Sequence, residues 1–307
     1  MIIRKPKALK PGDTISLVTP ASPLTPEKAE RGIKLLKDQG YRVKLYPSTY
    51  KADGYLAGSD EERAADLTAA FHDPHTHAVY CSRGGYGASR LMPYLDLDDL
   101  AESNKLFIGF SDVTTIHAAL NRRGLPTLHA PMAITFGPDR ESWVYQSFLQ
   151  AISGEDPIPP TAPKGVCITL GKASGTVVGG CLVLICDLIG TPEQIDMTDK
   201  IILIEDVDEA PHRVDAMLTH LLNSNSIQRA AGIVIGEMTR TDEKADKAIG
   251  AMPWRAIVKD RLGNLNIPCI VDFPCGHAAQ MLSLPLGIKA ELDASGGTMK
   301  YIESLCE

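Results

Sequence analysis

The hydrophobic pattern of the chain changes its period near residue 110. Residues 106–110 read Leu-Phe-Ile-Gly-Phe, an apolar run typical of a strand buried on both faces of a parallel sheet. Residues 113–120 then place Ile116, Ala119 and Leu120 at helical spacing. Ser111 and Asp112 lie at the junction. The pattern predicts a strand, a sharp turn and a helix, with one polar side chain above the carboxyl edge of the sheet.

Strands and helices alternate through the rest of the first half of the chain. Apolar runs predict strands at residues 15–18, 41–46 and 78–81, and helical spacing predicts helices at residues 26–39, 60–71 and 143–152. Because crossover helices connect parallel strands, we expect an α/β domain with an open, mostly parallel sheet flanked by helices.

A proline-rich segment without periodicity, residues 155–166, predicts a linker. It would join an N-terminal domain, residues 1–154, to a second, C-terminal α/β domain, residues 167–307. In the second domain we expect strands at 167–170, 173–178, 200–205, 232–236 and 266–272, and a helix at 181–189. Residues 284–293 and 298–302 are expected to form a terminal hairpin.

Composition narrows the class of protein. The 307 residues carry 31 basic and 38 acidic side chains, a net charge of −7, and no long basic run, which disfavours nucleic acid as a partner. No segment has the apolar length of a signal peptide or a membrane span. The seven cysteines are odd in number and form no C-x-x-C pair, so we expect reduced thiols and a cytoplasmic protein.

Residues 72–77 contain three histidines, but Pro74 interrupts them and their spacing does not match a metal site. We therefore expect a solvated loop here, and neither a metal nor another cofactor in the protein.

Ser111 is a candidate nucleophile. A serine on a strand-to-helix turn can attack an acyl group, and Gly109 leaves room for a tight backbone. The nucleophile-elbow pattern also has glycine two positions after the serine, where this chain has Val113. Ser and Asp are also common helix caps, which is an alternative without chemistry.

A second candidate element follows the strand at 78–81. Gly84 and Gly85 allow backbone amides to approach an oxyanion or a phosphate closely. The segment does not match G-x-G-x-x-G, so a dinucleotide site is weakly supported, and a tight turn before a helix remains an alternative.

A serine nucleophile needs a base and a carboxylate that orients the base. Of the eight histidines, His277 stands out because it lies on a short, stiff turn after a strand. Glu205 ends an aliphatic strand, where a sheet would present it. The alternatives are a polar turn residue for His277 and a surface ion pair, for example with Arg213, for Glu205.

Six short motifs occur together in an order and spacing that resemble the LD-carboxypeptidase family of serine peptidases, the muramoyltetrapeptide carboxypeptidases. They are Gly109-Phe-Ser-Asp, Arg83-Gly-Gly-Tyr-Gly, Gly179-Gly-Cys-Leu, Ile189-Gly-Thr-Pro, Leu203-Ile-Glu-Asp-Val-Asp-Glu and Gly276-His277. The resemblance covers nearly the whole chain.

The resemblance implies a triad of Ser111, Glu205 and His277 that is divided between the two domains. It implies an oxyanion hole formed by the amide of Asp112 and an amide of the Gly84–Gly85 loop. It also implies a cytoplasmic homodimer that works without a metal and removes the terminal D-alanine from a murein tetrapeptide by cutting an L-D peptide bond.

A carboxypeptidase must bind a free carboxylate, for which arginine is the natural partner. Arg83 and Arg240 each follow a predicted strand and are the candidates.

Three other functions remain open from the sequence. A relative of the same family could cleave a peptidyl or acyl nucleotide and confer immunity to a peptide antibiotic. The chain could also be a non-catalytic, two-domain binding protein for a small ligand. A nucleotide-binding oxidoreductase would depend on the glycines after Cys81 alone.

Overall fold

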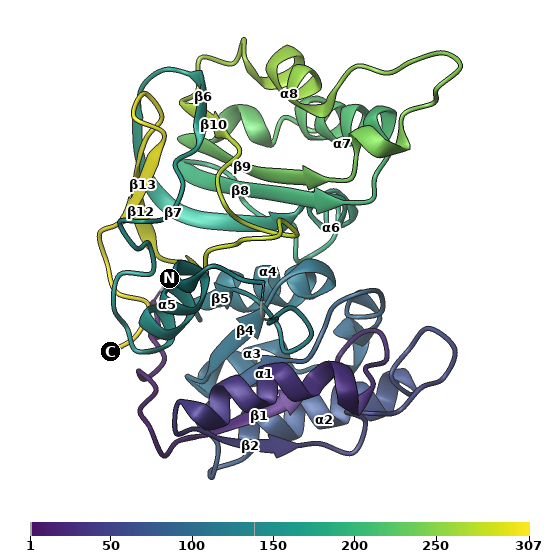
Figure 1. Ribbon diagram of the computed structural model, residues 1–307, viewed down its shortest axis with the longest axis vertical. Helices are drawn as coiled ribbons and strands as arrows, with labels where there is room; N and C mark the ends of the chain where they lie inside the picture. The colour runs from purple at the N-terminus through teal and green to yellow at the C-terminus, as the bar shows by residue number, and fades with distance from the viewer. Residues whose placement is uncertain (1, 138) are drawn as a thin grey trace. The chain divides into compact units, whose positions relative to one another are not determined.

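A computed structural model describes residues 2–137 and 139–307 and divides the chain into two units (Figure 1). Unit 1 contains residues up to 159 together with 282–287 and 304–307. Unit 2 contains residues 160–281 and 288–303. Both units are α/β, which confirms the predicted fold class.

Unit 1 is built on a six-stranded sheet in the order β11-β5-β4-β3-β1-β2. Five of these strands are parallel, and β11 alone is antiparallel to its neighbour. The strands are β1 (Thr14–Val18), β2 (Arg42–Leu45), β3 (Ala78–Cys81), β4 (Leu106–Gly109), β5 (Thr127–His129) and β11 (Leu284–Leu286). The helices are α1 (Pro26–Asp38), α2 (Asp60–His72), α3 (Leu97–Glu102), α4 (Thr114–Arg122) and α5 (Ser142–Ile152), with 3-10 turns η1 (Ser89–Tyr94) and η2 (Ser111–Val113).

The predicted helices of unit 1 form because their ends are marked in the sequence. Helix α1 begins with Pro26 in its first turn, where a missing N–H costs nothing. Helix α2 begins with a capping box, in which the Ser59 side chain accepts from the Glu62 amide and the Glu62 side chain accepts from the Ser59 amide. The sequence did not predict α3 or η1, which are only six residues long each.

Unit 2 contains a seven-stranded mixed sheet in the order β13-β12-β7-β8-β9-β10-β6. Strands β7 to β10 are parallel, whereas β6, β12 and β13 are antiparallel to their neighbours. The strands are β6 (Val166–Thr169), β7 (Lys172–Cys181), β8 (Lys200–Val207), β9 (Gly232–Thr239), β10 (Cys269–Val271), β12 (Lys289–Asp293) and β13 (Thr298–Tyr301). The helices are α6 (Leu182–Asp187), α7 (Pro211–Asn223) and α8 (Trp254–Leu262), with 3-10 turns η3 (Ile227–Arg229) and η4 (Asp242–Lys244).

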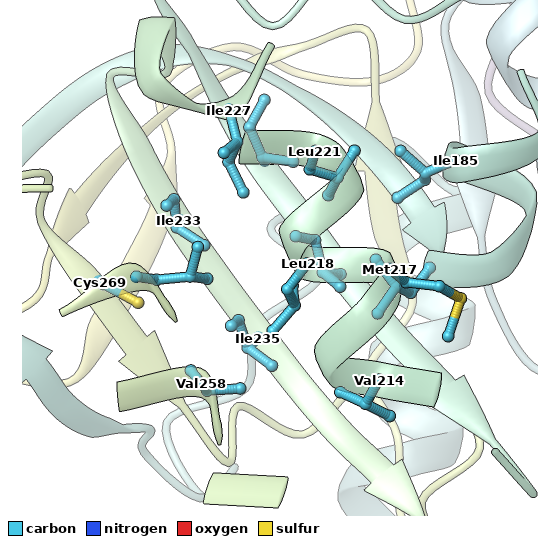
Figure 2. Packing of buried hydrophobic residues seen from close by; sticks show 14 of the residues in the cluster. Ile185, Val214, Met217, Leu218, Leu221, Ile227, Ile233, Ile235, Val258 and Cys269 are labelled. Atoms are coloured by element: carbon cyan, nitrogen blue, oxygen red, sulfur yellow. The ribbon is translucent and has the colours of Figure 1, made fainter. Parts of the chain in front are cut away.

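The main core of unit 2 lies between the sheet and helices α6, α7 and α8. Figure 2 shows Leu218 of α7 on the side of the helix that faces β9, where Ile233 and Ile235 lie on the same face of the strand. Alternate residues of a strand share a face, and these two isoleucines are fully buried. The core therefore holds β8 and β9, whose carboxyl ends carry the polar residues described below.

The C-terminal region differs from its prediction. We expected residues 284–293 and 298–302 to form one hairpin inside a continuous second domain. The hairpin consists of β12 and β13, whereas β11 pairs with β5 of unit 1. The physical reason is that Leu282, Leu284 and Leu286 are fully buried there and complete the edge of the unit 1 sheet.

Candidate active site

Ser111 is separated from the end of β4 by Phe110 alone and is the first residue of η2. Its backbone φ is +67°, in the left-handed region that L-residues adopt only at a cost. Among the non-glycine residues described by the structure, only Ser111 and Arg240 adopt a positive φ without being Asn or Asp. The turn is thus strained at the residue that the sequence singled out.

The neighbours of Ser111 make this turn possible. A Cβ on Gly109 would lie 2.8 Å from a methyl group of Val113 and 3.1 Å from Cβ of Cys81, so only glycine fits there. Val113 takes the position of the second elbow glycine and packs over Gly109. His117 donates from Nε2 to the Gly109 carbonyl at 2.9 Å, and its Nδ1 lies 2.7 Å from the Thr127 hydroxyl.

His117 itself has a packing role. Burial and the neighbouring His129 lower the pKa of His117 to about 3, so its imidazole is neutral.

The glycine loop, residues 82–88, lies beside Ser111 within unit 1. A Cβ on Gly84 would be 2.9 Å from the Ser111 Oγ and 3.2 Å from the Asp112 amide nitrogen. A Cβ on Gly85, whose φ is +109°, would be 2.3 Å from the Ser22 hydroxyl. The missing side chain of Gly84 therefore lets the loop approach Ser111, and that of Gly85 lets it approach Ser22.

Two side chains hold the second half of the glycine loop through hydrogen bonds to its backbone. The Ser22 hydroxyl accepts from the Tyr86 amide at 3.1 Å. The Asp112 carboxylate, which is buried, accepts from the Ala88 amide at 2.7 Å. Asp112 was predicted for its backbone amide alone, and the structure adds this role for its side chain.

Glu205 and His277 meet within unit 2. The Glu205 Oε2 atom accepts from the His277 Nδ1 atom at 2.7 Å and from the His277 backbone amide at 3.2 Å. Glu205 is fully buried, and the His277 side chain is 19% exposed. The carboxylate therefore fixes both the position and the tautomer of the imidazole, because Nδ1 carries the proton that it donates.

Local irregularities of the sheet position Glu205. Strand β8 runs two residues beyond Glu205, which was predicted to end it, so Asp206 also belongs to the strand. The pairing of β8 with β9 shifts between Ile204 and Asp206, leaving Gly236 and Glu237 opposite Glu205 alone. Such bulges redirect a side chain.

Glycines make room for the pair. A Cβ on Gly276, whose φ is +81°, would lie 2.3 Å from Oε2 of Glu205. A Cβ on Gly236 would lie 2.6 Å from both the carbonyl oxygen and the sulfur of Cys275. The turn that carries His277 can pack onto β8 and β9 only with glycine at both positions.

The electrostatics of this pair favour a charged imidazole. Burial alone lowers the pKa of His277, but the charge and hydrogen bond of Glu205 and the charge of Asp206 outweigh it, so the pKa is raised. Asp206 is buried and accepts from the Val183 and Val207 amides. Burial and the Glu205 charge raise the pKa of Asp206 to about 7.

The two candidate arginines have different partners. Arg240 is exposed and forms a bidentate ion pair with Asp208. Arg83 is half-buried and donates from Nη1 to the Pro23 carbonyl at 2.8 Å and from Nε to the Gly84 carbonyl at 3.2 Å. The charge of Arg240 is thus already matched by a carboxylate, whereas the contacts of Arg83 are with neutral carbonyls.

The histidine segment lies at the surface, and most of the cysteines lie in the interior. His72, His75 and His77 are exposed, and His77 accepts from the Thr14 amide. Within residues 2–137 and 139–307, no group of three or more His, Cys, Asp or Glu side chains is arranged to hold a metal ion. All seven cysteines are free, and six of them are buried.

In the described part of the chain, no helix combines the length and the apolar character needed to span a membrane.

Comparison with protein families gives two matches. The LD-carboxypeptidase N-terminal domain matches residues 15–130, and the LD-carboxypeptidase C-terminal domain matches residues 174–292.

Similar proteins cover nearly the whole chain. A probable murein peptide carboxypeptidase of Bacillus subtilis is 34% identical over 299 residues, covering 96% of this chain and 93% of the relative. The microcin C7 self-immunity protein MccF of Escherichia coli is 26% identical, covering 95% and 94%. The crystal structure of muramoyltetrapeptide carboxypeptidase from Oxalobacter formigenes superposes with a TM-score of 0.82 at 29% identity, covering 94% and 97%. On these matches, the chain belongs to the LD-carboxypeptidase family of peptidases.

Proposed function

We propose that this protein is a serine carboxypeptidase that needs no metal and releases the terminal D-alanine of a murein tetrapeptide by hydrolysing an L-D peptide bond. The observation that carries the proposal is the buried Glu205 carboxylate, which holds His277 by both its ring and its backbone. The name of the Bacillus subtilis relative and that of the Oxalobacter structure support the substrate class.

In the proposed mechanism, Ser111 of unit 1 and His277 of unit 2 act on the same substrate. Because Nδ1 of His277 donates to Glu205, the basic lone pair of the neutral ring is on Nε2. Nε2 takes the Ser111 proton as Oγ bonds to the substrate carbonyl carbon. The imidazolium then gives that proton to the leaving D-alanine nitrogen, and water hydrolyses the acyl-enzyme by the same route.

Two sets of groups would stabilise the charges that develop. Glu205 and Asp206 provide negative charge near the imidazolium. The Asp112 amide and an amide of Gly84 or Gly85 would donate to the oxyanion, each lowering the barrier by about 3–4 kcal/mol.

We assign the substrate carboxylate to Arg83 in preference to Arg240. A substrate carboxylate at Arg240 would have to displace Asp208, whereas Arg83 lies beside Gly84 and makes its contacts with neutral carbonyls. Arg83→Ala should reduce kcat/KM for the free-acid peptide much more than for its C-terminal amide. Equal losses on both substrates would exclude the assignment, and Arg240→Ala is the matched comparison.

The proposed function is tested by incubating the protein with murein tetrapeptide and following D-alanine release by mass spectrometry. Ser111→Ala should lower turnover by about 10⁴–10⁶-fold while circular dichroism shows an unchanged fold. Normal turnover by this variant would disprove the serine mechanism. A chelator such as EDTA should leave the wild-type rate unchanged.

A second substrate class belongs in the same assay because of the likeness to the MccF relative. A peptidyl or acyl nucleotide is incubated in parallel with the tetrapeptide. Preferential cleavage of the nucleotide conjugate would assign an immunity role in place of the murein activity, and binding of either compound without cleavage would indicate a binding protein.

We also propose that the protein acts in the cytoplasm as a homodimer, as expected from its free cysteines and from its family. Sedimentation equilibrium should give twice the 33.1 kDa chain mass. A single-chain mass at micromolar concentration would contradict the dimer.

A further inference from the structure

Arg63 of helix α2 is an arginine buried within unit 1. Its side chain has no exposed surface. A buried guanidinium is costly unless its donors are matched, and an apolar side chain of similar volume would often be cheaper. The partners of Arg63 therefore indicate what the charge does there.

The Arg63 guanidinium connects three separate backbone segments of unit 1. Nη1 donates to the Gly87 carbonyl at 2.9 Å and also to the Pro20 carbonyl, while Nε donates to the Gly58 carbonyl at 3.3 Å. Pro20 follows β1, Gly58 precedes α2 and Gly87 closes the glycine loop after β3. The planar fork of arginine can serve several acceptors in fixed directions, which the point charge of lysine cannot do.

The remaining partner of the guanidinium is Asp60, whose carboxylate forms an ion pair with Nη2 of Arg63. Burial lowers the pKa of Arg63, and the charges of Asp60 and Asp112 oppose this effect. The Asp112 carboxylate also holds the Ala88 amide, one residue after Gly87. Both backbone groups at the end of the glycine loop are thus held by buried charged side chains.

The backbone of Gly87 packs directly against the Arg63 guanidinium. Its φ is +127°, and a Cβ there would be 2.9 Å from Nη1 of Arg63. Three residues earlier, Gly84 lies against Ser111 and the Asp112 amide. Loss of the Arg63 contact would free the Gly87 end of a loop whose other part faces the nucleophile.

We infer that Arg63 is a positioning residue for the proposed hydrolysis, because its guanidinium fixes Gly87 and thereby holds the Gly84–Gly85 amides in place for the oxyanion. Arg63 touches no reacting atom. The inference rests on the proposed function.

The test compares Arg63→Met and Arg63→Lys with Arg90→Met. Arg90 is the matched control because it also pairs with Asp60, through Nε and Nη2, but its side chain is exposed. We expect Arg63→Met to lower kcat for tetrapeptide about 10–100-fold with KM within about twofold, since a small displacement near the reacting atoms costs this much. Arg63→Lys should be intermediate, and Arg90→Met should match the wild type.

A second readout separates positioning from a merely structural role. A peptide aldehyde, which forms a tetrahedral adduct with its oxygen in the oxyanion hole, should lose affinity for Arg63→Met by the same factor as kcat/KM. The product tripeptide, which forms no adduct, should bind with unchanged affinity. The urea midpoint of unfolding is measured for every variant. If Arg63→Met does not fold, the same comparison is made with Arg63→Lys, which keeps the buried charge.

The possible results distinguish the two claims. If wild-type protein releases no D-alanine and is not labelled by an aryl phosphonate, the proposed function fails. If the wild type is active and a folded Arg63 variant keeps the wild-type kcat and aldehyde affinity, the positioning role is wrong. Equal losses in aldehyde and tripeptide affinity would likewise overturn it.

Discussion

Glu205 holds His277 through two hydrogen bonds to one carboxylate oxygen, and this arrangement controls when the imidazole is charged. Burial would keep His277 neutral, but Glu205 and Asp206 raise its pKa. A general base must be neutral, so kcat/KM should rise as pH increases through this raised pKa. Burial and the charge of Glu205 raise the pKa of the neighbouring Asp206 to about 7.

The pH profile of Glu205→Gln tests this coupling. With the carboxylate removed, the burial of His277 remains and the main cause of its raised pKa is lost, so the acid limb of kcat/KM should move to lower pH. The same change removes a charge that raises the pKa of Asp206, which shifts its ionisation in the same direction. The rate at the optimum should fall on the order of 10⁴-fold.

The control for this profile is Glu237→Gln, which removes a half-buried carboxylate opposite Glu205 at the bulge. Its acid limb should coincide with that of the wild type. An acid limb at one and the same pH in Glu205→Gln and the wild type would refute the coupling.

At the level of single residues, the sequence identified candidates that belong to short motifs. It did not identify residues whose role depends on being buried next to distant segments. Ser111, Glu205 and His277 were selected from motif order, and the structure joins the last two by a hydrogen bond. Asp206, which lies beyond the predicted end of its strand, and Arg63 were not singled out. Their surroundings arise from distant segments, which no local pattern reports.

Among the elements of unit 1, the glycine loop packs closely against the Ser111 turn because glycine has no side chain. Gly84 does not have a positive φ, so its requirement for glycine comes from space alone. The sequence indicated both glycine positions but could not show which side chains they face. The match with the elbow pattern was incomplete at Val113, and the structure shows that a side chain at Gly109 would collide with Val113 and Cys81.

Gly84→Ala should therefore reduce catalytic activity more than it reduces the stability of the fold. Its new methyl group would lie 2.8 Å from Cβ of Ser111 and 3.2 Å from the Asp112 amide. We expect kcat/KM to fall about 10²–10³-fold, as for the loss of one oxyanion donor. Urea denaturation should show a loss of about 1–3 kcal/mol in unfolding free energy from crowding.

Gly137→Ala is the control, because a Cβ there meets only Arg31 Nη1 at 3.6 Å and its φ is not positive. This variant should keep wild-type turnover. Wild-type activity in Gly84→Ala would mean that the space beside Gly84 is not used in the reaction.

On the scale of the whole molecule, the chain returns twice from unit 2 to unit 1. Residues 282–287 supply β11, and residues 304–307 bond back to the start of the chain, where the Glu307 amide donates to the Pro6 carbonyl at 3.0 Å. The composition of residues 155–166 predicted a linker, and the division of the chain after residue 159 falls inside this segment. It could not predict these returns, because an apolar strand sequence does not specify which sheet it joins.

Leu286→Ala should consequently destabilise unit 1. Leu286 is fully buried in β11, and truncating such a leucine costs about 2–5 kcal/mol. Each unit contains one tryptophan, Trp143 in unit 1 and Trp254 in unit 2, so a Trp254→Phe background reports unit 1 by fluorescence. Urea unfolding in this background should shift to lower concentration, with Leu292→Ala in unit 2 as the comparison. An unchanged Trp143 transition in Leu286→Ala would contradict the assignment of β11.

The central claim is that Ser111 is activated by His277 for covalent attack. The most direct measurement is the site and rate of labelling by an aryl phosphonate, mapped by peptide mass spectrometry. The account predicts one adduct, on Ser111, with labelling abolished in Ser111→Ala and slowed by on the order of 10²–10⁴-fold in His277→Ala. An adduct on another residue, or equal labelling rates with and without His277, would contradict it.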